Sequence, residues 1–423
     1  MKNESYGLSP KEMSESIRTL LVIGYVWPEP NSSAAGCHMM SLMSLFQGNG
    51  WKVHFASPAA RGEHECDLAV RGIFSHEIVL NCSSFDAFVS ELNPSVVLFD
   101  RFMMEEQFGW RVAQACPHAL RVLDMEDFHS LRQARHEAVK KGRSYREADL
   151  FTEKAQREVA AIFRCDLSLV ISEAEKELLT SQYQVTEELL VWCPFLLEPD
   201  EYPVPAFHER EHMVSIGNFR HAPNWDAVLQ LKQKIWPLIR KKLPEVQLHI
   251  YGAYPPPKAV QLHDPQDGFL VKGWAVDARE VMRQSRLCLA PLRFGAGLKG
   301  KLTEAMLCGT PSITTSVGGE GIAGTFLWPG AIEDDFADFA QQAVALYSDE
   351  LEWQHRQARG AEILKTRFDR EEIGKRVLSE VNSCLRDIEA HRRKNFIGQM
   401  LQHQSLKATQ YLSQWIEAKN QHE

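Results

Sequence analysis

The sequence predicts an α/β protein with two Rossmann-like, doubly wound domains facing a central cleft, followed by a C-terminal helical extension. Three observations predict this architecture. Short apolar runs of strand length alternate with amphipathic helical stretches along most of the 423 residues. A proline-rich segment without periodicity interrupts the alternation near the middle of the chain. The alternation then begins again, which indicates a second sheet of similar size.

The composition is that of an ordinary globular protein. Hydrophobic residues make up 44% and charged residues 24% of the chain, and a chain of this length can bury several cores. The net charge of −9 is spread along the sequence, which argues against a nucleic-acid partner. The nine cysteines form no CxxC pair, so we expect neither a disulfide framework nor a zinc ribbon. Without a signal-peptide pattern or an apolar run of about 18 residues, we expect a cytoplasmic protein.

The first domain is predicted at residues 18–195, after a flexible lead of residues 1–17. The apolar run Thr19–Val26 predicts a strand that is covered on both faces. A loop rich in Pro, Asn, Ser and Gly follows at Trp27–Gly36 and leads to a helix that ends at Gly48. Further strands are predicted at 53–56, 95–99, 120–123, 167–171 and 189–192, and helices around 105–116, 130–164 and 173–183.

The second domain is predicted at residues 213–375, after a linker at 196–212. The stretch CPFLLEPDEYPVPAFHEREH around this linker contains four prolines and no periodicity. Strands are predicted at 213–216, 246–250, 269–271, 287–290 and 312–314, and helices at 225–242, 277–284, 301–308, 335–348 and 351–366. Residues 376–423 form the predicted helical extension.

Two familiar motifs match this sequence without the context that they need. The segment from His208 to His212 satisfies two zinc-protease patterns, but it follows two prolines and runs into a strand, so we expect no metal site. The segment from Gly295 to Gly300 satisfies GxGxxG. It lies late in the chain rather than in a first βα unit, so NAD or FAD binding stays an alternative only.

The stretch LCLAPLRFGAGLKGKLTEAMLCGTPSITTSVGGEG, residues 287–321, predicts a diphosphate site. A strand ends at Pro291, and Arg293 and a Gly-rich loop precede a helix that is expected to begin near Lys301. Loop amides, a helix N-terminus and basic side chains together attract phosphate. Glu304, in the first turn of the expected helix, can accept hydrogen bonds from a ribose diol.

With these motifs the sequence resembles the retaining glycosyltransferases of GT-B fold, in group 1 or family 4. The resemblance covers about residues 19–375 and is strongest in FLVKGWAVDAREVMRQSRLCLAPLRFGAGLKGKLTEAMLCGTPSITTSVGGEG. The stretches SIGNFRHAPNWDAVLQLKQKIWPLIRKKLPEVQLHIYG, VLDMEDFHSLR and CDLSLVISEAEKELL also look like family segments. The resemblance implies a nucleotide-diphosphate sugar as donor, transfer with retention of anomeric configuration, and no required metal or other cofactor.

The resemblance also implies roles for residues of the second domain. Glu304 would hold the ribose, and Lys301 and Arg293 would neutralise the departing diphosphate. The other donor-binding candidates are Gly217, Arg220, Asn224, Gly273, Gly295, Gly297, Glu320 and Gly321. Arg220 and Asn224 are included because Asn218 and Pro223 stand where many members carry Arg and Lys. Ala296 stands where many members carry a glutamate that contacts the sugar.

In the first domain, the resemblance implies an acidic residue or histidine facing the reacting sugar. Two registers fit, one with Glu126 and Asp127 and the other with His129. A helix N-cap cluster is the structural alternative for these residues. The acceptor-side loop would contribute Asn31, Ser32 and Gly36. The composition of this loop does not distinguish between a saccharide, a lipid-linked and a protein acceptor.

The tail carries an apolar helical stripe that lies beyond the resemblance. After the basic stretch at 391–394, apolar residues recur with i, i+1, i+4, i+5 spacing, which makes one helical face. They are Phe396, Ile397, Met400, Leu401, Tyr411, Leu412, Trp415 and Ile416. Such a face suits packing on the body or on a second subunit. It also suits peripheral contact with the inner face of a membrane.

The sequence therefore predicts a glycosyltransferase that uses a nucleotide-diphosphate sugar. One alternative is another sugar-nucleotide reaction on the same scaffold, such as epimerisation. A second, which Ala296 motivates, is a sugar-nucleotide or glycan-binding protein without turnover.

Overall fold

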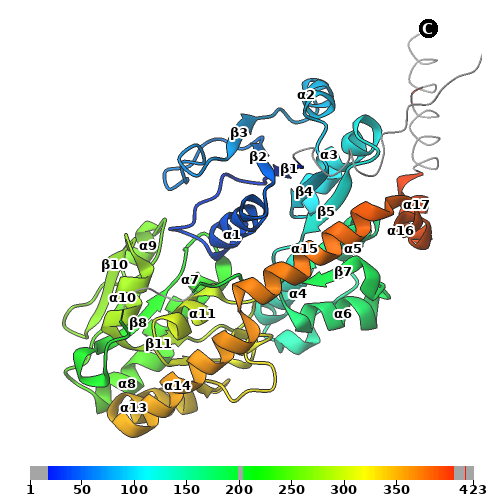
Figure 1. Cartoon of the computed structure of the whole chain (residues 1–423). Coiled ribbons are helices and arrows are strands. Elements are labelled where there is room, and N and C mark those ends of the chain that lie inside the picture. The colour runs from blue at the N-terminus through cyan, green and yellow to red at the C-terminus, as the bar shows by residue number, and fades with distance from the viewer. Residues whose placement is uncertain (1–17, 199–202, 404–414, 416–423) are drawn as a thin grey trace, which may run out of the picture.

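The computed structural model describes residues 18–198, 203–403 and 415, and it has the expected two α/β domains followed by helices (Figure 1). The N-terminal domain holds a seven-stranded parallel sheet of order β3-β2-β1-β4-β5-β6-β7. Its strands are β1 Thr19–Ile23, β2 Lys52–Ser57, β3 Phe74–Glu77, β4 Val96–Asp100, β5 Leu120–Asp124, β6 Leu167–Val170 and β7 Leu190–Trp192. Its helices are α1 Ala34–Gly48, α2 Ser84–Leu92, α3 Phe102–Ala115, α4 His129–Lys140, α5 Glu153–Arg164 and α6 Glu173–Tyr183.

The C-terminal domain repeats this plan with a six-stranded parallel sheet of order β10-β9-β8-β11-β12-β13. Its strands are β8 Glu211–Ile216, β9 Leu248–Tyr251, β10 Phe269–Gly273, β11 Ser285–Ala290, β12 Ser312–Thr314 and β13 Gly330–Ile332. Its helices are α7 Ala222–Gln230, α8 Trp236–Lys242, α9 Pro257–Val260, α10 Ala278–Gln284, α11 Gly300–Leu307, α12 Ser316–Gly319, α13 Phe336–Ser348 and α14 Glu350–Arg367. A π-helical turn at Leu231–Ile235 joins α7 to α8.

The strand order places a topological switch point in each sheet. In the first sheet the order reverses between β1 and β4, and in the second between β8 and β11. Ligands of doubly wound sheets bind beyond the carboxyl ends of the strands at such points. The loops that follow β1, β8 and β11 are those that the sequence predicts to hold acceptor and donor, so the topology favours the same loops.

The elements missing from the sequence prediction are short or exposed. Strand β3 (FSHE) lies at the sheet edge and is mostly exposed, and β13 has three residues; neither shows the continuous apolar run of a buried strand. The helical stretch expected at 130–164 is two helices, α4 and α5. Gly142 ends the first with φ +73°, a conformation that Gly adopts without strain.

Helix α15 (Arg370–Arg386) returns the chain to the N-terminal domain, as Figure 1 shows in orange. Its apolar face, including Ile373, Val377 and Val381, packs in the core that contains β1, β4 and β5. The boundary that the sequence suggests at residue 375 falls inside this helix, because local periodicity does not say which domain a helix covers. Helices α16 (Ile388–Lys394) and α17 (Phe396–Gln402) follow, and α17 lies against α5. None of the described helices is long and apolar enough to cross a membrane.

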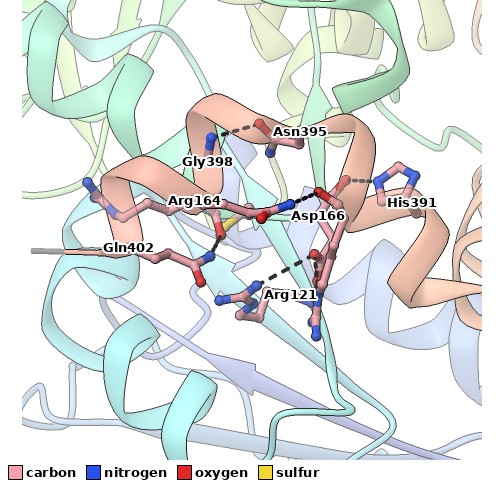
Figure 2. Close-up of a pocket in the computed structure, with 10 residues that line it drawn as sticks. Arg121, Arg164, Asp166, His391, Asn395, Gly398 and Gln402 are labelled. Atoms are coloured by element: carbon pink, nitrogen blue, oxygen red, sulfur yellow. Dashed lines mark hydrogen bonds and ion pairs between the residues drawn. The ribbon is translucent and has the colours of Figure 1, made fainter.

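Polar contacts, rather than the apolar stripe, dock α16 and α17 (Figure 2). The Arg392 guanidinium donates to both carboxylate oxygens of buried Asp166 at 2.8 Å and to the carbonyls of Pro117 and Ala119. His391 Nε2 lies 2.7 Å from the Asp166 carbonyl. The stripe residues Phe396, Ile397, Met400 and Leu401 remain exposed, as does Trp415. Tyr411, Leu412, Ile416 and the lead of residues 1–17 lie outside the described residues.

We predict that Arg392→Ala lowers the free energy of unfolding by about 3 kcal/mol, because it leaves the buried Asp166 carboxylate without its main partner. Burial opposes ionisation, but Arg392 and Arg121 hold the pKa of Asp166 below its usual range. This contribution should be present above about pH 4 and fade at lower pH. Urea unfolding measures it. Arg393→Ala is the control and should change the free energy of unfolding by no more than about 0.5 kcal/mol. Arg393 is exposed, and its ion pair with Glu389 is long, at 4.0 Å. Equal effects of both variants would contradict the assignment.

Candidate functional site

The carboxyl end of β8 and helix α11 converge on one ammonium group. Lys301 Nζ donates to Asn224 Oδ1 at 2.7 Å, and the Asn224 amide donates to the carbonyl of Asn218 at 2.9 Å. A Cβ at Gly217 would lie 2.7 Å from Lys301 Nζ, so Gly217 leaves the space that the lysine occupies. Three predicted donor residues, Gly217, Asn224 and Lys301, are therefore in contact.

Lys301 carries a partly buried charge without a neutralising partner. Among the described residues, no carboxylate lies within ion-pair distance of its ammonium. Burial lowers the pKa of Lys301 to about 8. A cation in this setting attracts an anion more strongly than it would in water, because the surrounding protein screens it less.

Glu304 lies on the same helix and faces the N-terminal domain. Helix α11 begins at Gly300, one residue earlier than expected, so Glu304 is in its second turn. Burial raises the pKa of Glu304, and the charge of Glu304 in turn contributes to raising the pKa of Cys37 on α1 to about 12, an effect that is due mainly to burial. The Glu304 carboxylate therefore lies near the interface between the two domains.

The Gly-rich loop at 295–300 is embedded in the N-terminal domain. Gly297 has φ +61°, and a Cβ there would lie 2.6 Å from Cβ of Asp127. Its N–H donates to Glu175 Oε1 at 2.5 Å. Ala296 is buried in the N-terminal core cluster that includes Met125 and Phe128. The direct contact between Gly297 and Asp127 joins the predicted donor loop to the predicted catalytic loop.

A second contact between the domains engages Glu320. Arg135 on α4 binds the Glu320 carboxylate through two hydrogen bonds, of 2.6 and 2.9 Å, and also donates to the Gly295 carbonyl at 2.9 Å. Arg135 is 9% exposed. Although burial opposes ionisation, Arg135 and Lys299 lower the pKa of Glu320. Arg135 of the N-terminal domain thus keeps the Glu320 side chain ionised.

Two predicted donor residues have partners that the sequence does not reveal. Arg293 forms a two-pronged ion pair with Asp226 of α7, with Nε 2.8 Å from Oδ2, so its charge is matched within its own domain. Arg220 lies over the ring of Tyr254, with Cζ 3.4 Å from the centroid. Neither residue contacts Lys301 in this arrangement. The partners come from distant segments, which spacing within the motif cannot show.

The turn around Gly273 and Trp274, at the end of β10, is partly exposed and contacts the N-terminal domain. Gly273 has φ +78° and no heavy atom within 4 Å of a built Cβ. The Trp274 indole N–H donates to the carbonyl of Asn31 at 3.1 Å, and the ring stacks on His64 at 4.4 Å. Gly321, after α12, faces Ser172 of the N-terminal domain.

The acceptor-side loop is held by Glu29. The Ser32 hydroxyl donates to Glu29 Oε2 at 2.6 Å, and the Tyr254 hydroxyl donates to the same carboxylate at 3.1 and 3.2 Å. Gly36 lies in the first turn of α1, where a Cβ would meet the Glu29 backbone at 2.5 Å. The loop therefore contacts the C-terminal domain through Asn31 and Glu29.

A group of buried ionisable side chains surrounds Glu126. Glu126 has φ +54° and is buried, and its Oε1 has no hydrogen-bond partner among the described residues. Burial and the neighbouring Asp124 raise the pKa of Glu126, and burial and Asp100 likewise raise the pKa of Asp124. His38 Nε2 lies 3.8 Å from Asp124, and burial lowers the pKa of His38. The neutral carboxylic acid is therefore favoured at Glu126 near neutral pH.

Asp127 has the opposite character. It pairs with Arg132 and lies 3.3 Å from His129 Nδ1. Burial opposes ionisation, but the positive charges of His129, Arg132 and Arg101 hold the pKa of Asp127 at about 2. His129 begins α4, and its Nδ1 lies 2.8 Å from the Asp127 carbonyl. Adjacent carboxyl groups thus differ in charge, a pattern typical of acid–base sites.

Several site residues escape the sequence analysis because they come from other elements. Glu175 lies in the quoted stretch SEAEKELL, and Asp124 in VLDMEDFHSLR, but nothing local marks them. The others are His38, Asp100, Arg101, Arg135, Asp226 and Lys299. His208 and His212 lie in a 3-10 turn and in β8 rather than on one helix face.

Comparisons with known proteins bear on the fold and on the family of the C-terminal domain. Residues 210–349 match the family model described as glycosyl transferases group 1. The chain has the GT-B fold. It is similar to the pneumococcal O-GlcNAc transferase GtfA in complex with UDP and GlcNAc (TM-score 0.64, 14% identity, 88% of this chain and 100% of that chain). It is also similar to Anabaena HepE in complex with UDP and glucose (TM-score 0.64, 13% identity, 86% and 99%).

A third GT-B structure differs more in length. The chain is similar to a TarM mutant of S. aureus in complex with fondaparinux, α-GlcNAc-glycerol and UDP, with a TM-score of 0.53 and 14% identity. The match covers 70% of this chain and 58% of that chain. None of the curated proteins matches this sequence. The match to the group 1 model supports a glycosyltransferase, whereas the solved structures, at 13–14% identity, show the fold alone.

We predict that Lys301→Met raises the free energy of unfolding at pH 7 by about 1–3 kcal/mol, because it removes a partly buried charge that has no carboxylate partner among the described residues. The wild type should gain stability as the pH rises from about 8 to 10.5, since the unfolded state then binds more protons, and the advantage of the variant should shrink. Denaturant unfolding at pH 7, 8 and 9.5 measures both. Destabilisation of Lys301→Met at pH 7 would contradict this reading of the site.

Proposed function

We propose that this protein transfers a sugar from a nucleotide-diphosphate donor to an acceptor hydroxyl with retention of anomeric configuration. The observation that carries the proposal is Lys301, a partly buried cation without a carboxylate partner among the described residues, placed beside Gly217 and Asn224 at the switch point of the second sheet. A diphosphate supplies the missing negative charge. The UDP complexes of GtfA and HepE support the same donor class.

The second domain would bind the donor in an extended arrangement. Lys301 and the amides of the Gly-rich loop would take the diphosphate, and Glu304 would accept hydrogen bonds from the ribose. The turn at Gly273 would hold the base. This assigns charge neutralisation to Lys301 and the loop rather than to a metal ion. Arg293 would serve this role only after leaving Asp226, so we assign it a supporting one.

The first domain would serve the reacting sugar. Cleavage of the sugar–phosphate bond develops negative charge on the diphosphate, which Lys301 and the loop amides would stabilise. Positive charge develops at the anomeric carbon, and the Asp127 carboxylate lies in the loop that contacts Gly297. Glu126, buried and favoured in its neutral form, would donate a hydrogen bond to a sugar hydroxyl. As the sugar–phosphate bond breaks and the bond to the acceptor oxygen forms, the proton of the acceptor hydroxyl would pass to the departing phosphate oxygen. The direct contact between the domains would limit hydrolysis by excluding water.

The exposed face of α17 would bring the protein to an anionic membrane surface, where a lipid-linked acceptor would be available. Phe396 and Met400 are 66% and 58% exposed. Residues 393–423 carry four lysines and arginines against two glutamates, in a chain whose net charge is −9. A basic segment with an exposed apolar face favours anionic lipid over a second, equally acidic copy of the chain.

A nucleotide panel tests the donor site. We expect one of UDP, GDP and ADP to stabilise the wild type against heat, by about 2.7 kcal/mol at 100 times its dissociation constant. A Glu304→Ala, Lys301→Ala double variant should lose this shift, whereas Lys258→Ala, which lies over the Trp225 ring, should keep it. Stabilisation by NAD alone would favour the dinucleotide alternative instead. Product analysis with and without acceptors separates transfer from epimerisation and from binding without turnover.

Vesicle flotation tests the membrane proposal. We expect the wild type to float with vesicles of phosphatidylglycerol but not of phosphatidylcholine, because attraction requires anionic lipid. A Phe396→Ser, Met400→Ser variant should lose flotation. Leu351→Ser, at a residue 72% exposed on α14, is the matched control and should float. Wild-type protein that stays unbound, or equal loss in the control, would contradict the assignment. Greater flotation on removal of residues 404–423 would mean that the tail covers this face.

A further inference from the structure

Glu175 joins the two loops that would perform the transfer. It lies in the first turn of α6 and is 1% exposed. Its Oε1 accepts a hydrogen bond from the Gly297 N–H at 2.5 Å and another from the Phe128 N–H at 3.2 Å. Gly297 belongs to the donor loop of the C-terminal domain, and Phe128 follows Glu126 and Asp127. One oxygen atom therefore links backbone groups from both domains.

The loops that Glu175 links are in close contact. The Gly297 backbone has φ +61°, and any Cβ there would meet Asp127 Cβ at 2.6 Å and Ile171 at 2.9 Å. The neighbouring Ala296 is buried in the N-terminal core. A glutamate at 296 would bring its charge into that core at a cost of several kcal/mol. A carboxylate at position 296 is therefore disfavoured, and the carboxylate that accepts a hydrogen bond from the backbone of this loop is that of Glu175.

The second carboxyl oxygen of Glu175 lies in an environment that destabilises the fold. Oε2 is buried and has no hydrogen-bond partner among the described residues. Burial and the nearby Asp127 charge raise the pKa of Glu175, while Lys299 and the two backbone N–H groups oppose this effect. A buried polar atom without a partner destabilises the fold by about 1–3 kcal/mol. Such groups are concentrated at functional sites.

We propose that Glu175 is a positioning residue, which fixes the donor loop against the Glu126–Asp127 loop in the arrangement required for transfer. It acts through the backbones of Gly297 and Phe128, rather than by touching the reacting atoms. The effect of Glu175 on the transfer rate rests on the proposed function. The bridge that Glu175 forms between the domains does not depend on that function.

Three variants and a control separate positioning from stability. Glu175→Ala removes the bridge. Glu175→Gln keeps an acceptor oxygen and the size of the side chain. Gly297→Ala forces the two loops apart while Glu175 itself is not substituted. Glu177→Ala, at an exposed residue on the same helix, is the control. We would measure kcat and KM for the donor, binding of the nucleoside diphosphate that the panel identifies, and small-angle scattering of the unliganded proteins.

We expect kcat to fall about 100-fold in Glu175→Ala and Gly297→Ala, since misplacement by about 1 Å has effects of this size. In Glu175→Ala the affinity for the nucleoside diphosphate should change less than about threefold, because Lys301, Glu304 and the Gly-rich loop keep their residues. Glu175→Gln should recover kcat to within about tenfold of the wild type, because its amide oxygen can still accept both N–H groups. The radius of gyration should increase only in Glu175→Ala and Gly297→Ala.

Wild-type kcat in Glu175→Ala, or a Glu175→Gln variant as impaired as Glu175→Ala, would overturn the inference. Should Glu175→Ala fail to fold, Gly297→Ala and Glu175→Gln still decide it. A wild type that binds no nucleoside diphosphate and has no turnover would reject the proposed function. The scattering comparison would then decide the bridge by itself, and an unchanged radius of gyration in both loop variants would reject it.

Discussion

The insertion of the Gly-rich loop of one domain into the other is the contact on which the rest of the site depends. Gly297 meets Asp127 at a distance that no side chain could occupy, and Ala296 enters the N-terminal core. These small residues let two sheets, each with its own switch point, present their carboxyl ends to one another. A larger residue at either position would separate Lys301 from the ionisable cluster around Glu126, and neither half of the site is complete alone.

The charges around this contact divide into satisfied and unsatisfied groups. Arg135 with Glu320 and Arg293 with Asp226 are matched pairs that hold loops in place. Glu126 and Glu175 are buried, and each has one carboxyl oxygen without a hydrogen-bond partner among the described residues. Lys301 is partly buried and has no carboxylate partner among them. A fold selected for stability alone would pair or replace such groups. Their presence at one interface is consistent with the binding and catalytic roles that we propose for them there.

The sequence predicts the fold well because the information is local. Continuous apolar runs such as Thr19–Val26 and the proline-rich linker establish two parallel sheets, and the structure confirms the fold class. The candidate site is harder to predict from the sequence, because its geometry depends on the contact between the domains. Motif spacing identifies Lys301, Asn224 and Gly217 as candidates, and the structure brings them together. Motif spacing cannot show that Arg293 pairs with Asp226. Nor can it show that Glu175 accepts a hydrogen bond from Gly297, which lies 122 positions further along the chain.

The path of the chain explains why such long-range contacts are needed. The backbone crosses between the domains twice, once before β8 and once between α14 and α15. The two crossings lie side by side, since the Leu197 N–H donates to the Phe368 carbonyl at 3.3 Å. Two adjacent connections restrain separation of the domains but leave rotation about a common hinge. Alignment of the site must therefore come from non-covalent contacts away from the hinge, and the hydrogen bonds of Glu175 and Arg135 to the Gly-rich loop provide it.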